Sequence, residues 1–105
     1  MMLFLKPWEP LVAATSIQFF EHELLREIAG AHALYGRRVQ AIAKNSTCDD
    51  VLYRLDDGTF SQVHLTFTRA PPGLPGWPGH DECEKLADWM IVVMVPNHID
   101  HFGLW

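Results

Sequence analysis

The sequence predicts an α+β fold with the element order α-β-β-β-α, in which a three-stranded antiparallel meander is packed by an N-terminal and a C-terminal helix. Two alternating apolar runs flank an Asp-Asp-Gly turn in the middle of the chain. On each side of this pair of runs, a helix-capping motif precedes an apolar stretch. The 105 residues, of which 49% are apolar and 20% are charged, are expected to form a single small domain.

The first helix is predicted over residues 16–29. Thr15 and Gln18 have the spacing of a capping box, and apolar side chains then recur at intervals of three and four positions. The glutamates of this stretch, Glu27 among them, are expected on its solvent side. Residues 1–14 are expected to form an extended N-terminal arm, because their prolines interrupt both helical and strand periodicity.

The first strand is predicted over residues 37–46, with Val39, Ala41 and Ala43 alternating on the side that faces the helix. These inward side chains are small, which suits a helix that lies close over the strand. A turn rich in Asn, Ser, Thr and Asp then leads into the central hairpin.

The central hairpin is predicted over residues 48–67, where apolar residues alternate on both sides of the Asp-Asp-Gly turn. A two-residue turn would place Val51 opposite His64, whereas a three-residue loop with a left-handed glycine places Val51 opposite Val63. The three-residue loop keeps the apolar face together, and we predict that register. It also places Asp50 opposite His64 on the other face of the sheet.

Prolines and glycines crowd residues 69–80, which are predicted to form a long structureless loop. Trp77 in this loop is a candidate for lining a ligand groove, and anchoring in the core is the alternative. Asp81 and Glu84 have the spacing of a second capping box. A second helix is therefore predicted after them, and it is expected to end at Pro96, after which Asn97 is a candidate cap for one last turn through Phe102.

The C-terminal stretch at 86–95 is apolar on every side, which indicates a surface that must be covered. Its apolar run would also suit a buried strand, but the capping box favours a helix. On a helix, Ile91, Val92 and Met94 point away from the side that covers the sheet and would face water in a monomer. We therefore expect these three residues to form part of a homodimer interface or to contact another protein.

Asp50 and His64, with Cys48 nearby, are the candidate catalytic residues. A carboxylate that orients an imidazole beside a thiol is the arrangement of a Cys-His nucleophile, which would suit a small hydrolase-like enzyme. The structural alternative is a carboxylate that holds a strand histidine on a half-exposed sheet face.

His98 and His101 have a spacing that would place both imidazoles on one face of a helix, where they could bind one metal ion. The sequence offers no evident third ligand. No bound metal and no cofactor is therefore expected.

Charge and composition argue against several classes of partner. The net charge is -5 and the only adjacent basic pair is Arg37-Arg38, so binding to nucleic acid is not expected. The longest apolar run is far shorter than the roughly 20 residues that span a bilayer, and the N-terminus lacks the order of a secretory signal, so neither membrane insertion nor export is expected. Cys48 and Cys83 lack the spacing of a zinc site and are expected to be reduced thiols in the cytoplasm.

Several short segments carry a resemblance. They are Glu23–Glu27, His32–Arg37, Cys48–Leu52, Leu55–Gly58, Val63–Thr66 and Trp77–Pro78. In these segments the chain resembles a family of small uncharacterised bacterial proteins. The resemblance implies a bacterial cytoplasmic domain of one piece, and it implies no substrate, cofactor or catalytic residue.

The sequence leaves two functions open. The first is a non-enzymatic protein-interaction or regulatory module that self-associates, which the apolar helix favours. The alternative is the hydrolase-like enzyme that uses Asp50 and His64 with Cys48. A concave, apolar-lined pocket at these three residues would favour the enzyme, and a flat sheet face would favour the module.

Overall fold

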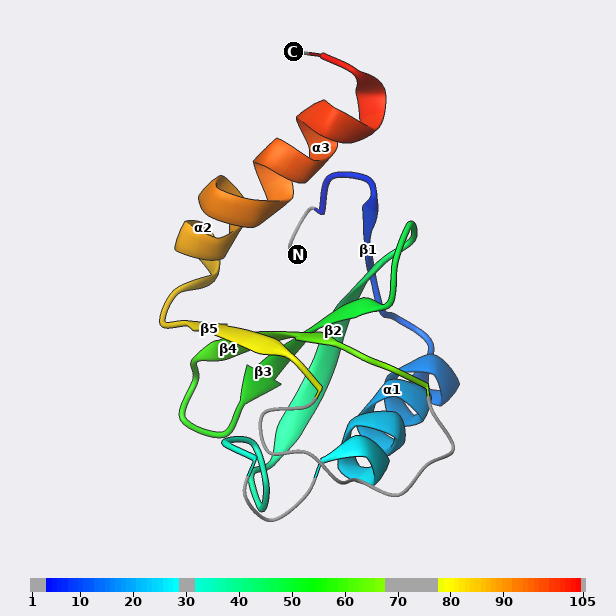
Figure 1. The fold of residues 1–105 in the computed structure, drawn as a ribbon, viewed down its shortest axis with the longest axis vertical. Helices are drawn as coiled ribbons and strands as arrows, with labels where there is room; N and C mark the ends of the chain where they lie inside the picture. The colour runs from blue at the N-terminus through cyan, green and yellow to red at the C-terminus, as the bar shows by residue number, and fades with distance from the viewer. Residues whose placement is uncertain (1–3, 29–31, 68–77, 105) are drawn as a thin grey trace.

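The computed structural model describes residues 4–28, 32–67 and 78–104, which form an antiparallel sheet with helices on both faces (Figure 1). The five strands of the described residues follow one another across the sheet in chain order: β1 (Trp8–Pro10), β2 (Val39–Asn45), β3 (Asp50–Leu55), β4 (Phe60–His64) and β5 (His80–Cys83). Helix α1 (Ala14–Glu27) packs on one face. A continuous C-terminal helix packs on the other, and it consists of α2 (Leu86–Trp89), the π-helical segment η1 (Met90–Met94) and α3 (Val95–Phe102).

The side chains of β3 explain why both faces are covered. Val51, Tyr53 and Leu55 point into the apolar cluster beneath α1. Leu52 points to the opposite face and belongs to a second cluster with Trp89 of the C-terminal helix. Because successive residues of a strand face opposite sides, a strand that is apolar at consecutive positions needs a covering element on each side.

The predicted three-stranded sheet is wrong, because β1 and β5 add one strand at each edge. β1 pairs with β2 although it ends in Pro10, since an edge strand forms backbone hydrogen bonds on one side only. β5 pairs with β4 through His80–Cys83, a segment too polar to show apolar alternation. The structure is α+β, and the sheet of its described residues has five strands rather than three.

The predicted register of the central hairpin is confirmed. Val51 lies opposite Val63, and Asp50 lies opposite His64. The last residue of the loop, Gly58, has a φ of 84°. Only glycine adopts this conformation without strain, which explains how a three-residue loop closes here.

The first predicted strand is present as β2, but its alternation changes within the strand. The register with β3 shifts between Ala41 and Ala43, so that Ala41 packs under α1 and Ala43 packs under the C-terminal helix. The expectation that these two residues share a face is therefore wrong. Ile42 is the extra residue of this bulge, and its carbonyl accepts a hydrogen bond from the N–H of Leu11 at 3.0 Å.

The two predicted capping boxes do not set the helix starts. Helix α1 begins at Ala14, one residue before Thr15, and has no side-chain hydrogen bond at its N-cap. Asp81 lies in β5, and the C-terminal helix begins after an extended Lys85. Packing of the apolar helix faces on the sheet therefore determines where these helices lie.

The C-terminal helix does not end at Pro96 as expected. Its middle segment is π-helical, and the N–H of Val95 donates to the carbonyl of Met90, five residues earlier. Pro96 then falls in the first turn of α3, where a missing N–H is tolerated, and the helix continues to Phe102. Among the helices that the structure describes, none is long and apolar enough to cross a membrane.

Trp77 and most of the predicted loop at 69–80 lie outside the described residues. The groove that Trp77 was expected to line therefore stays a prediction. The predicted loop included residue 80, but His80 is the first residue of β5.

Candidate functional site

Asp50 and His64 meet on the sheet face that carries the C-terminal helix. They are cross-strand partners in β3 and β4, and His64 Nδ1 donates to Asp50 Oδ1 at 2.6 Å. Asp50 Oδ2 accepts a second hydrogen bond from Gln62 Nε2 at 2.9 Å. Gln62 Oε1 in turn accepts one from Trp89 Nε1 at 2.9 Å. We call these four side chains the polar chain, since they connect a buried indole to an imidazole at the surface.

The three hydrogen bonds of the polar chain determine which of its side-chain atoms donate and which accept. An indole N–H can only donate, so the oxygen of Gln62 faces Trp89 and its amide N–H faces Asp50. The carboxylate of Asp50 then selects the His64 tautomer with hydrogen on Nδ1, which leaves Nε2 as the acceptor of the ring. The His64 side chain is 57% exposed, and it lines a hollow of about 420 Å³ beside Asp81.

Cys48 lines a hollow that Asp50 shares and His64 does not. Cys48 lies in the turn between β2 and β3, and this hollow, of about 400 Å³, is also lined by Asn97 and His101. Burial raises the pKa of the Cys48 thiol and outweighs the hydrogen bond from the Asp50 backbone, so the thiolate is scarce at neutral pH. The structure thus pairs the predicted carboxylate with the imidazole and places the predicted thiol in a second hollow, which the same carboxylate also lines.

His98 and His101 lie one turn apart on α3, and their ring nitrogens face different surroundings. His98 Nδ1 donates to the carbonyl oxygen of Lys6 at 2.7 Å, whereas His101 lines the hollow at Cys48. The rings of both histidines pack against Phe102, with centroid distances of 5.0 Å and 4.8 Å. In the part of the chain that the structure describes, no group of three or more His, Cys, Asp or Glu side chains is placed to hold a metal ion.

The C-terminal helix presents apolar side chains to solvent. Ile91 is 69% exposed and Val92 is 71% exposed, as the sequence predicts. The expectation that Met94 faces water is wrong, because Met94 is 4% exposed and its sulfur accepts a hydrogen bond from the N–H of Leu5 at 3.4 Å. A π-helical turn takes about one residue more than an α-helical turn, and this change of period turns Met94 inward.

The exposed apolar surface extends further along the helix than the sequence predicts. Val95 and Phe102 are exposed, and so is Leu104 just beyond the helix end. Val95 and Phe102 lie about two α-helical turns apart and therefore on the same side of α3. The prediction did not place Val95 on the exposed side of its helix, and Phe102 and Leu104 lie beyond the end that it expected at Pro96. We call Ile91, Val92, Val95, Phe102 and Leu104 the exposed helix face.

A groove of about 280 Å³ runs beside Val92, between the C-terminal helix and β5. The apolar part of its lining consists of Cys83, Trp89, Val92 and Val93. Acidic side chains of β5 and α2 border it. The exposed helix face therefore has projecting side chains and an apolar hollow next to each other.

The chain matches no family model, and neither a curated protein nor a solved structure matches it. Its resemblance to small uncharacterised bacterial proteins therefore stays a prediction.

Proposed function

We propose that this protein is a non-enzymatic protein-interaction or regulatory module that self-associates through its C-terminal helix. The observation that carries the proposal is the exposure of the adjacent side chains Ile91 and Val92 on a helix whose other side is buried in the fold. Burying such a side chain completely contributes roughly 1.5–3 kcal/mol. A contact with a second molecule would supply that burial.

The groove beside Val92 favours a second copy of the chain as the partner. Ile91 and Val92 project next to a groove that Trp89 and Val93 line. A two-fold axis near Val92 would bring the projecting side chains of each copy to the groove of the other. Such a contact uses the same patch on both molecules, which is the usual geometry of a homodimer.

The length of the exposed helix face suits a small interface. Residues 86–102 form a helix about 25 Å long, at 1.5 Å per residue, and Leu104 extends the apolar surface beyond its end. Two such helices packed side by side would form an interface near the lower limit of stable specific contacts, about 1,200 Å² in total. We therefore expect a dimer that dissociates on dilution.

Replacing Ile91 and Val92 together by Glu tests the interface. The variant I91E/V92E should be a folded monomer, because both side chains are exposed and four desolvated charges in a dimer would prevent association. Val12→Glu is the matched control, since Val12 is 81% exposed but lies outside the C-terminal helix. If the double variant still associates, or if the Val12→Glu control loses association to the same extent, another surface is used.

The Asp50–His64 pair supports a second candidate function, a small hydrolase-like enzyme. His64 would act as a general base through Nε2 while Asp50 orients its ring. The raised pKa of Cys48 disfavours its thiol, so the attacking group would be water. Hydrolysis of activated esters that is lost in His64→Gln and kept in Cys48→Ala would favour this function over the module.

A further inference from the structure

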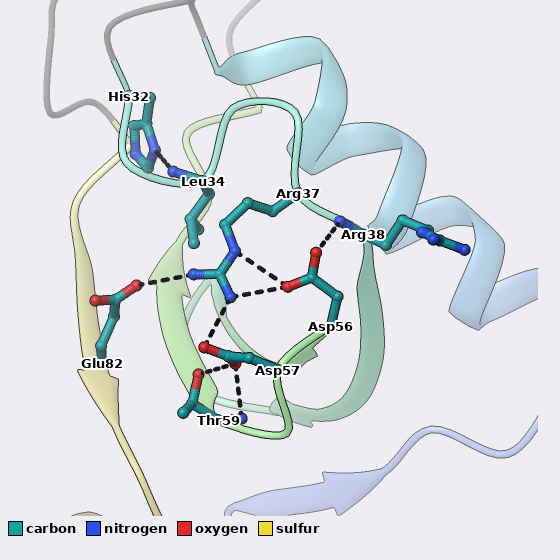
Figure 2. Close-up of polar contacts among 8 residues, drawn as sticks. All are labelled: His32, Leu34, Arg37, Arg38, Asp56, Asp57, Thr59 and Glu82. Atoms are coloured by element: carbon teal, nitrogen blue, oxygen red, sulfur yellow. Dashed lines mark hydrogen bonds and ion pairs between the residues drawn. The ribbon is translucent and has the colours of Figure 1, made fainter.

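Arg37 binds the acidic side chains at the tip of the central hairpin (Figure 2). Its Nη2 lies 2.8 Å from Asp56 Oδ1 and 3.1 Å from Asp57 Oδ2. Its Nη1 lies 4.0 Å from Glu82 Oε1 of β5. Thr59 donates to Asp57 Oδ1 through its N–H at 3.0 Å and through its hydroxyl at 2.6 Å.

These contacts favour the ionised form of both aspartates and supply hydrogen-bond partners to their carboxylates. The hydrogen bond from Arg37 lowers the pKa of Asp56, and the hydrogen bonds from Thr59 lower the pKa of Asp57. The second oxygen of Asp56 faces the backbone N–H of Arg38 at 3.5 Å. Both carboxylates bind Arg37, and among the described residues neither forms an ion pair with Arg38 or Arg54.

In the part of the chain that the structure describes, Arg38 and Arg54 have no acidic partner. Among the described residues, neither guanidinium group makes an ion pair or a side-chain hydrogen bond, whereas the guanidinium of Arg26 is bound by Glu23. Figure 2 shows the Arg38 side chain extending away from the carboxylate of Asp56. At this end of the sheet the acidic side chains of Asp56, Asp57 and Glu82 all contact Arg37, and Arg38 and Arg54 remain without a direct acidic partner among the described residues.

The two arginines line one hollow together with Gln40. Arg54 of β3 is the cross-strand partner of Gln40 in β2, and Arg38 lies two residues before Gln40. All three line a hollow of about 270 Å³ at the hairpin end of the sheet. Asp56 also lines it, but Arg37 already binds the carboxylate of Asp56.

A hollow of this composition suits an anion. An arginine presents its N–H donors in a planar fork that matches the oxygen atoms of phosphate and carboxylate groups. An anion placed between two neighbouring guanidinium groups is attracted by both, and these two attractions outweigh the repulsion between the groups. The side-chain amide of Gln40 adds an uncharged donor at the same place.

We infer that this hollow binds a small oxyanion, a phosphate or a carboxylate group, between the guanidinium groups of Arg38 and Arg54, with Gln40 as a further donor. Arg37 acts as a positioning residue, because it binds Asp57 and also Asp56, whose side chain lines the hollow. The site lies outside the exposed helix face, and it does not depend on self-association.

Titration of the full chain with sodium phosphate, and separately with sodium acetate, tests the site when sodium chloride keeps the ionic strength constant. The readout is the NMR chemical shift of the Arg38 and Arg54 Nε–H groups and of the Gln40 amide. Saturable shifts with phosphate identify a phosphate site, and saturable shifts with acetate identify a carboxylate site. Shifts that saturate with neither anion would overturn the inference.

Variants separate binding from general charge effects. Arg54→Lys keeps the charge but removes the planar fork, so it should weaken binding roughly tenfold, the loss expected for one charged hydrogen bond. The double variant R38A/R54A should abolish binding, and both side chains are exposed, so the fold should persist. Arg26→Ala is the control, because it removes an exposed arginine that is already ion-paired. Unchanged affinity in the double variant, or an equal loss in the control, would contradict the site.

Discussion

The indole rings of Trp8 and Trp89 meet edge to face, with their centroids 4.8 Å apart and their planes at 83°. This contact joins β1, at one edge of the sheet, to the C-terminal helix. Trp8 is fully buried, and its Nε1–H donates to Asn97 Oδ1 at 2.9 Å, so its polar atom is satisfied. The N-terminal segment around β1 is therefore part of the folded unit.

Trp8→Ala should lower the free energy of unfolding by roughly 3–5 kcal/mol, because it leaves a cavity where a fully buried indole packed. Urea denaturation measures the loss. Trp8→Phe keeps most of the ring and loses the hydrogen bond to Asn97, so its effect should be smaller. A loss below about 1 kcal/mol for Trp8→Ala, no more than a typical substitution, would mean that β1 is not docked on the sheet in solution.

Glu27 is buried at the end of α1, although the sequence predicts it on the solvent side. Its Oε1 accepts hydrogen bonds from the N–H and the hydroxyl of Thr66, both at 2.7 Å, and its Oε2 accepts one from the N–H of Phe67 at 3.0 Å. Burial by itself would raise the pKa of Glu27. Hydrogen bonds with Glu23, Thr66 and Phe67 outweigh burial and hold that pKa below its ordinary value.

Glu27→Gln should therefore destabilise the fold in a pH-dependent way. A carboxylate whose pKa is lowered by folding contributes stability that is fully present above its unfolded pKa, about 4.3 for glutamate, and lost as the pH falls through the folded value. The stability difference between the variant and the unmodified chain should be largest near neutral pH and should shrink in acid. Urea denaturation across this range measures it, with the exposed Glu9→Gln as control. A difference that stays constant into strong acid would refute this role of Glu27.

Ser61 is fully buried in β4, and its Oγ has no hydrogen-bond partner among the described residues. Ser61→Ala should raise the free energy of unfolding by roughly 1 kcal/mol, because it removes a desolvated hydroxyl at little cost in packing. Ser46→Ala, in the exposed turn after β2, should leave stability unchanged. Destabilisation by Ser61→Ala would show that the hydroxyl has a partner in solution.

The sequence predicts the central hairpin correctly because its register depends on neighbouring residues. The loop length, the left-handed Gly58 and the apolar pair Val51 and Val63 all favour one pairing. The edge strands leave no such local signal. β1 contains a proline and β5 consists largely of polar residues, and both are strands because they dock on a sheet that is already formed.

The candidate sites likewise divide into features that local sequence predicts and features that depend on how distant elements pack. The Asp50–His64 pair could be predicted from the hairpin register, whereas the bond between Gln62 and Trp89 depends on where the C-terminal helix crosses the sheet. The burial of Met94 depends on a π-helical segment that apolar periodicity does not indicate. The hollow between Arg38 and Arg54 becomes evident only when the acidic partners of the neighbouring arginine are known.

Sedimentation equilibrium of the unmodified chain over a wide concentration range tests self-association through the exposed helix face most directly. The average mass should rise from that of one chain at low micromolar concentration toward that of two chains at hundreds of micromolar, because Ile91 and Val92 become buried between copies. The same series on I91E/V92E should stay at the mass of one chain. A mass of one chain for the unmodified protein at every concentration would contradict the proposed function.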